Sequence, residues 1–189
     1  MLGFASETTA LRPVHREQLL YFMIRPPHAL ALEIDRQRRL LGFVSKYPLE
    51  QFHITLLPLG DIRALSPEQL ELIRSAAASL QAEPVSLVLS RLKKNALAGS
   101  NTRALRALQR ELVRRLVGLS IPLPDYDFHP HLTLAYGDWQ KRSEMVSPLH
   151  WRMDALLLVN STHGEGHKLL GCWELSTRQG MFDFMTPQG

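Results

Sequence analysis

Two four-residue patterns hold the side chains best suited to chemistry in this chain. His53-Ile54-Thr55-Leu56 in the first half recurs in type as His131-Leu132-Thr133-Leu134 in the second. Side chains alternate between the two faces of a β-strand, so a histidine and a threonine two positions apart point the same way. Each strand therefore offers one imidazole and one hydroxyl on a single surface.

Two imidazoles and two hydroxyls suit the hydrolysis of a phosphodiester, including a five-membered cyclic one. A base must take a proton from the attacking water and an acid must protonate the departing oxygen. Imidazoles, with an ordinary pKa of about 6.5, can do both near neutral pH. The hydroxyls of Thr55 and Thr133 can donate hydrogen bonds to non-bridging oxygens as charge develops there. This scheme needs no metal and no cofactor. The alternative is that His53 and His131 are ordinary structural histidines, which the repeated hydroxyl on the same face disfavours.

Alternating and amphipathic patterns predict the elements that carry these motifs. Short apolar or alternating runs predict strands at residues 19–24, 51–59, 85–89, 128–136, 153–161 and 169–176, with a turn at residues 93–95 into a short partner strand. Helical stripes predict a helix of about 14 residues after Pro26-Pro27, a second helix that begins with the capping box of Ser66 and Gln69, and a third from Asn101 or Thr102 to about Val117. The similar motif strands in the two halves indicate a duplicated architecture.

Composition favours one folded, soluble domain. Hydrophobic residues make up 45% and charged residues 21% of the 189 residues, as in average soluble proteins. A formal charge of +4 is compatible with a polyanionic partner. Cys172 is the only cysteine, which excludes an intramolecular disulfide and a zinc site built mainly from thiolates. With neither a signal-peptide pattern nor an apolar run long enough for a membrane span, we expect a cytoplasmic protein.

The sequence resembles the two-histidine phosphoesterase superfamily, in the bacterial branch named for 2′-5′ RNA ligase and RNA 2′,3′-cyclic phosphodiesterase. The resemblance rests on HITL and HLTL, and is supported by YFMIRPP, LLPLGD, ALRALQREL, FHPHLTLAYG and LLLVNST. It implies an α+β fold of two lobes related by a pseudo-twofold axis, with antiparallel sheets lining a central cleft and helices outside. We expect a single domain of this kind over residues 17–178, with terminal extensions at 1–16 and 179–189.

The resemblance also implies an activity. Such proteins hydrolyse 2′,3′-cyclic phosphates of nucleosides or RNA ends, commonly to the 2′-phosphate, and some join RNA ends through 2′-5′ bonds. By resemblance His131 is the base and His53 the acid, an order that sequence alone does not fix. Two departures concern substrate binding. Many relatives have an aromatic residue at the position of Pro58, and some have a basic residue at that of Tyr136.

Weaker signals surround these motifs. His129 with His131, and His163 with His167, could suggest metal ligands, but a hairpin loop explains the second pair better and we expect no metal. Phe22, Arg25 and Tyr136 are candidate nucleotide contacts, although core packing explains Phe22 better. An arginine face on the third predicted helix could meet an RNA backbone, but a solvated face is the more common explanation; its members are Arg103, Arg106, Arg110 and Arg114.

The leading hypothesis is therefore a metal-independent phosphodiesterase for RNA processing that acts on 2′,3′-cyclic ends as a monomer. One alternative is a nucleotide-binding or RNA-binding module that performs no turnover. Another is a phosphodiesterase for a different small ester, such as a 2′-5′ oligonucleotide.

Overall fold

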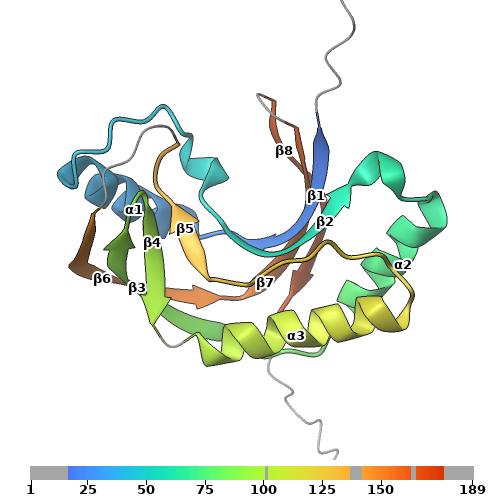
Figure 1. Cartoon of the computed structure of the whole chain (residues 1–189). Helices are drawn as coiled ribbons and strands as arrows, with labels where there is room; N and C mark the ends of the chain where they lie inside the picture. The colour runs from blue at the N-terminus through green and yellow to red at the C-terminus, as the bar shows by residue number, and fades with distance from the viewer. Residues whose placement is uncertain (1–16, 101, 137–141, 163–164, 177–189) are drawn as a thin grey trace, which may run out of the picture.

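Two four-stranded antiparallel sheets dominate the computed structural model, which describes residues 17–100, 102–136, 142–162 and 165–176 (Figure 1). The first sheet has the order β2-β1-β7-β8, with β1 at Gln18–Ile24, β2 at Ile54–Asp61, β7 at Ala155–Thr162 and β8 at Gly166–Glu174. The second has the order β5-β4-β3-β6, with β3 at Val85–Lys93, β4 at Ala96–Ser100, β5 at His131–Thr133 and β6 at Ser143–Met153. The predicted α+β class with antiparallel sheets is confirmed, and each motif lies at an edge strand.

Two strand predictions need correction. The strand predicted over residues 128–136 is only His131–Thr133, because the chain before it runs as an extended segment that does not pair within a sheet. The long strand β6 was not predicted at all. Its polar residues and Pro148 disguise it, and an edge strand tolerates both, since one side of its backbone needs no ladder partner.

The helices follow the predicted patterns closely. Helix α1 spans His28–Leu40 after the two prolines, and α2 spans Pro67–Ala78. Ser66 and Gln69 form the predicted capping box, with each side chain accepting from the other residue's backbone N–H. Helix α3 spans Arg103–Gly118; Asn101, one of its two predicted starting residues, lies outside the described residues. Short 3₁₀ turns η1 and η2, at Leu49–Gln51 and Ile62–Ala64, flank β2.

Helices α1 and α3 each pack against the sheet whose strand they do not follow in the chain. Helix α1 follows β1 of the first sheet but packs on β6 of the second, where Gln37 donates to the backbone carbonyl of Ser147 at 3.1 Å. Helix α3 follows β4 of the second sheet but contacts β2 of the first, with α2 beside it on β8 (Figure 1). Helices α1 and α3 thus each connect the two sheets, whereas α2 follows and covers the same sheet.

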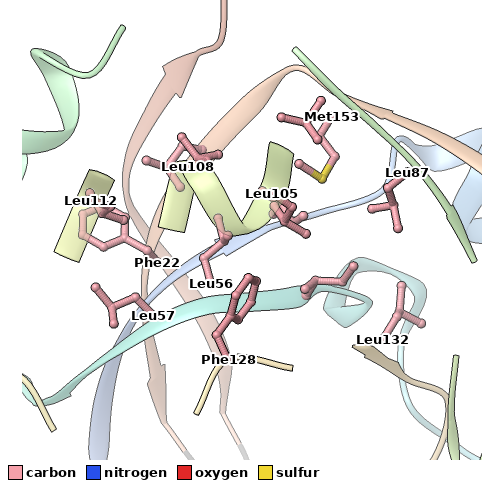
Figure 2. Close-up of a cluster of buried hydrophobic side chains, with 14 of the residues drawn as sticks. Phe22, Leu56, Leu57, Leu87, Leu105, Leu108, Leu112, Phe128, Leu132 and Met153 are labelled. Carbon is pink, nitrogen blue, oxygen red and sulfur yellow. The ribbon is translucent and has the colours of Figure 1, made fainter. Parts of the chain in front are cut away.

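One apolar core joins both halves. The face of α3 formed by Leu105, Leu108, Leu112 and Leu116 is buried, as its helical spacing predicted. Figure 2 shows three of these leucines beside Phe22 of β1, Leu56 and Leu57 of β2, Leu87 of β3, Leu132 of β5 and Met153 of β6. No helix within the described residues has the length and apolarity to cross a membrane.

Candidate active site

His53 is held in one orientation by a backbone carbonyl two residues before it in the chain. Its Nδ1 lies 2.6 Å from the carbonyl oxygen of Gln51, which can only accept, so Nδ1 carries a proton and donates it. In the neutral ring Nε2 is then the basic nitrogen. The hydroxyl of Tyr47 donates to the same Gln51 oxygen at 2.7 Å, which fixes the carbonyl in turn.

His131 repeats this arrangement in the second sheet. Its Nδ1 lies 2.7 Å from the carbonyl oxygen of His129, again two residues before it in the chain. The same reasoning makes Nδ1 the donor and Nε2 the basic nitrogen. The two motifs therefore share a histidine tautomer as well as a sequence. They differ in burial, because His131 is exposed and His53 is half-buried.

The threonines lie on the same faces as the histidines. Ile54 and Leu56, which flank Thr55, are fully buried, and so are Leu132 and Leu134 around Thr133. Both threonines are half-buried. The predicted alternation, with apolar residues inward and His and Thr outward, is thus confirmed in both motifs.

The fold brings the two motifs together. Strands β2 and β5 contact each other although they belong to different sheets. The segment leading into β5 runs along β2, where the hydroxyl of Tyr126 donates to the backbone carbonyl of Thr55 at 3.3 Å (Figure 1). The charge of His131 also contributes to the electrostatics of His53. The two motifs therefore lie close together in the fold.

Burial lowers the pKa of His53. Loss of solvent is the largest cause, and the nearby charges of Arg25 and His131 act in the same direction, whereas the hydrogen bond to Gln51 opposes them. The free protein therefore favours the neutral form of His53. For His53 to act as an acid, a bound anion must restore its affinity for a proton.

A third histidine, which sequence reasoning set aside as a loop residue, lies beside His53. The β7–β8 hairpin places the ring of His167 edge-on to that of His53, with centroids 5.1 Å apart. Nη2 of Arg25 lies 2.9 Å from Nδ1 of His167. The other end of the sequence pair, His163, lies outside the described residues. The sequence marked His167 only as a possible metal ligand with His163, and nothing in it placed His167 beside His53, because the hairpin that carries it is distant from both motifs in the chain.

A pocket of about 370 Å³ opens next to His167. Its walls come from the loop before β2, the chain after β5 and the β7–β8 hairpin. Tyr47 and Tyr136 are both in its lining and pack edge-on against each other, with ring centroids 5.2 Å apart. The remaining lining is mostly polar and consists of Gln51, Ser161, Thr162, Glu165 and Gly166. Such a pocket can hold a planar group that needs both stacking and hydrogen bonds.

A second pocket of about 240 Å³ has His131 in its lining. It contains three basic groups, Lys93, Arg106 and His129. Arg106 was predicted on a solvated helix face, which is wrong for this residue. Its Nη1 donates to the carbonyl of Phe128 at 2.8 Å, and its guanidinium lies 5.8 Å from the centroid of the Phe128 ring. A polyanion that extended from His131 into this second pocket would therefore meet positive charge.

The three predicted nucleotide contacts have different fates. Phe22 is fully buried and packs against Trp173 with centroids 6.1 Å apart, so it belongs to the core, and contact with a ligand is excluded. Tyr136 is 65% exposed and borders the larger pocket. Arg25 is half-buried next to His53 and His167. The described residues contain no cluster of three or more His, Cys, Asp or Glu side chains suited to a metal ion.

Known proteins resemble this chain in sequence family and in fold. The family model of the 2′-5′ RNA ligase superfamily matches residues 26–165. Escherichia coli LigT complexed with 3′-AMP superimposes with a TM-score of 0.69 at 19% identity, covering 86% of this chain and 100% of LigT. A protein of Thermus thermophilus gives 0.62 at 21% identity, covering 85% and 99%. A structure described as a phosphoesterase gives 0.67 at 19%, covering 85% and 99%. No curated protein matches.

Proposed function

The chain belongs to the 2′-5′ RNA ligase superfamily, and we propose that within it this protein is an RNA 2′,3′-cyclic phosphodiesterase that works without a metal. The observation that carries the proposal is the matched pair of histidines. Each has Nδ1 tied to a carbonyl two residues back and presents Nε2, and the two strands that bear them contact each other. Acid/base chemistry at one phosphorus uses a base for the attacking oxygen and an acid for the leaving oxygen, and two imidazole nitrogens can fill both roles.

The reaction assigns one role to each histidine. His131, as base, takes a proton from water while the water oxygen attacks phosphorus. The bond from phosphorus to the ribose 3′-oxygen breaks, and His53, as acid, gives that oxygen its proton. The product is a 2′-phosphate and a 3′-hydroxyl. If a 5′-hydroxyl of RNA replaced the water, the same steps would form a 2′-5′ bond.

The charge of the substrate favours the protonated form of His53, which is the form that can act as an acid. Burial holds the pKa of His53 down in the free protein, and an anionic phosphate beside the ring favours the charged form. The hydroxyls of Thr55 and Thr133 would hold the non-bridging oxygens, where negative charge grows in the transition state. His53 therefore becomes protonated when a phosphate binds beside it, and it can then donate this proton to the leaving oxygen.

Two features support RNA as the natural substrate. The larger pocket offers Tyr47 and Tyr136 as surfaces for a base, and the smaller one offers Lys93 and Arg106 for a phosphate further along the strand. The LigT complexes with 3′-AMP and with phosphate show that a protein of this fold binds such groups.

The test is hydrolysis of the four 2′,3′-cyclic nucleotides and of a short RNA with that end, in excess chelator, with the phosphate isomer identified by ³¹P NMR. We expect turnover to the 2′-phosphate by the unaltered protein and none by His53→Ala or His131→Ala. His150→Ala, at an exposed histidine of β6, is the matched control and should keep full activity. Full activity in either motif variant would reject the proposal, and tight binding without cleavage would identify a binding module instead.

A further inference from the structure

Arg25 and His167 form a contact whose protonation state is fixed. A guanidinium can only donate, so the Nη2 of Arg25 that lies 2.9 Å from Nδ1 of His167 makes that nitrogen the acceptor. The imidazole proton is therefore on Nε2. The pKa of His167 is lowered to about 4, chiefly by burial and further by the nearby charges of His53 and Arg25, so the ring stays neutral near pH 7. The pair carries one positive charge and retains several N–H donors.

The positive charge of Arg25 is not balanced locally. Within the described residues no ion pair includes Arg25, although most other half-buried or buried arginines have one, such as Arg38 with Asp35. Its Nε is buried without a hydrogen-bond partner among those residues. Burial accordingly lowers the pKa of Arg25. A partly desolvated cation with spare donors is costly unless an anion binds it.

The position of this cation is set by strand pairing. In the antiparallel pair of β1 and β2, Ile24 lies opposite Ile54. Arg25 directly follows Ile24 and His53 directly precedes Ile54, so the two residues leave this strand pair at the same end. The β7–β8 hairpin then closes over both, with the His167 ring 5.1 Å from the His53 ring. The cation and the histidine of the first motif thus share one wall of the site.

We propose that Arg25, oriented by His167, binds the phosphate group on which His53 and His131 act. This deepens the proposed function and rests on it for the identity of the reacting group. Arg25 supplies the charge, and the His167 ring, neutral near pH 7, adds no repulsion to the arginine. His167 is a positioning residue, because its acceptor nitrogen fixes the direction in which the guanidinium presents its remaining donors.

Equilibrium binding tests the anchor without relying on turnover. Isothermal titration calorimetry of inorganic phosphate, adenosine 2′-monophosphate and adenosine is compared between the unaltered protein and Arg25→Gln. We expect a loss of about 10- to 100-fold for the two phosphate ligands, the usual worth of a charged hydrogen bond, and no change for adenosine. Arg25→Lys should recover part of the loss because it restores the charge. Arg36→Gln, at an exposed arginine of α1, removes a charge elsewhere and should bind phosphate normally.

Two His167 variants separate positioning from packing. In His167→Asn the amide oxygen occupies the place of Nδ1 and still accepts from Arg25, whereas His167→Leu fills the space and accepts nothing. We expect the asparagine variant to bind inorganic phosphate within a few-fold of the unaltered protein and the leucine variant to resemble Arg25→Gln. Equal binding by both would overturn the positioning role. This pair of variants also serves if Arg25→Gln fails to fold, which thermal unfolding reveals.

The outcomes keep this inference distinct from the proposed function. If Arg25→Gln binds inorganic phosphate as tightly as the unaltered protein, the inference is wrong even where cyclic nucleotides are hydrolysed. If phosphate binding falls but no cyclic phosphate is ever cleaved, the anchor stands and the proposed reaction does not. The competing explanation is that Arg25 binds a neighbouring phosphate of the RNA instead of the reacting phosphate. A loss of kcat/KM on a dinucleotide with a cyclic end but not on a cyclic mononucleotide would assign Arg25 to that neighbouring phosphate and overturn the proposal.

Discussion

Replacing His53 by asparagine should remove the acid that we propose and little else. The amide nitrogen of asparagine takes the place of Nδ1 and can keep the donation to the Gln51 carbonyl, which His53 makes at 2.6 Å. Nothing replaces Nε2. Positioned acids contribute about 10²- to 10⁴-fold, so the barrier should rise by roughly 2.7 to 5.4 kcal/mol and kcat on a 2′,3′-cyclic nucleotide should fall by that factor.

A change of leaving group identifies which step was lost. In a cyclic substrate with sulfur at the 3′ bridging position, the thiolate departs without protonation, so an acid has nothing to contribute. His53→Asn should then lose less than about tenfold, whereas His131→Asn, which lacks the base, should remain as impaired as on the oxygen substrate. Equal impairment of His53→Asn on both substrates would refute the acid role. Rescue of His131→Asn alone would show that the roles are reversed.

Three further predictions concern the phosphate donors, a buried charge and acid stability. Thr55→Val or Thr133→Val should each lower kcat about 10²-fold, while the serine variants keep a hydroxyl and most of the activity in the same assay. Asp35→Asn should reduce the free energy of unfolding in urea by about 3 to 5 kcal/mol, because it leaves the buried Arg38 without its charged partner; a change below about 1 kcal/mol would contradict this. Because the folded pKa of His167 is about 4 and the ordinary value is 6.5, the unfolded chain binds more protons between these values. This contribution to stability should therefore be fully present above pH 6.5 and be lost as the pH falls from 6.5 to about 4, and thermal unfolding should show a smaller decline in His167→Asn.

The sequence was informative wherever local rules decide the structure. The capping box at Ser66, the buried stripe of α3 and the alternation in both motifs follow from spacing within a few residues, and all were predicted. Strand β6 escaped because its backbone needs only one partner, so it tolerates Pro148 and exposed polar residues. The strand around His131 was predicted too long because an apolar run does not reveal whether a partner strand is within reach.

The same distinction applies to the candidate site. Paired motifs identified His53 and His131 because two copies of one pattern are visible in a linear sequence. Nothing linear connects Arg25 to His167, because Arg25 follows β1 and His167 lies on β8, which is two strands away in the sheet, and their contact depends on the tertiary fold. Tyr47 was missed for a similar reason, since its role is to hold a carbonyl that holds a histidine. Groups that act through other groups leave no spacing to detect.

The exchange of helices between the sheets explains why such a site can be rigid although it lies between two halves. Because α1 covers the sheet that it does not follow, and α3 does the same, separating the sheets would expose both helices and divide the shared core. Arg38 extends this bracing to the site: it pairs with Asp35 on α1, donates to the carbonyl of Tyr47 at 3.0 Å and lies 5.3 Å from the centroid of the Phe52 ring. The loop that orients His53 is thus anchored to a helix packed on the sheet that carries His131. The relative position of the two motifs is therefore set by the common core, so in the reaction that we propose substrate binding would not need to assemble the site and would only supply the charge that protonates His53.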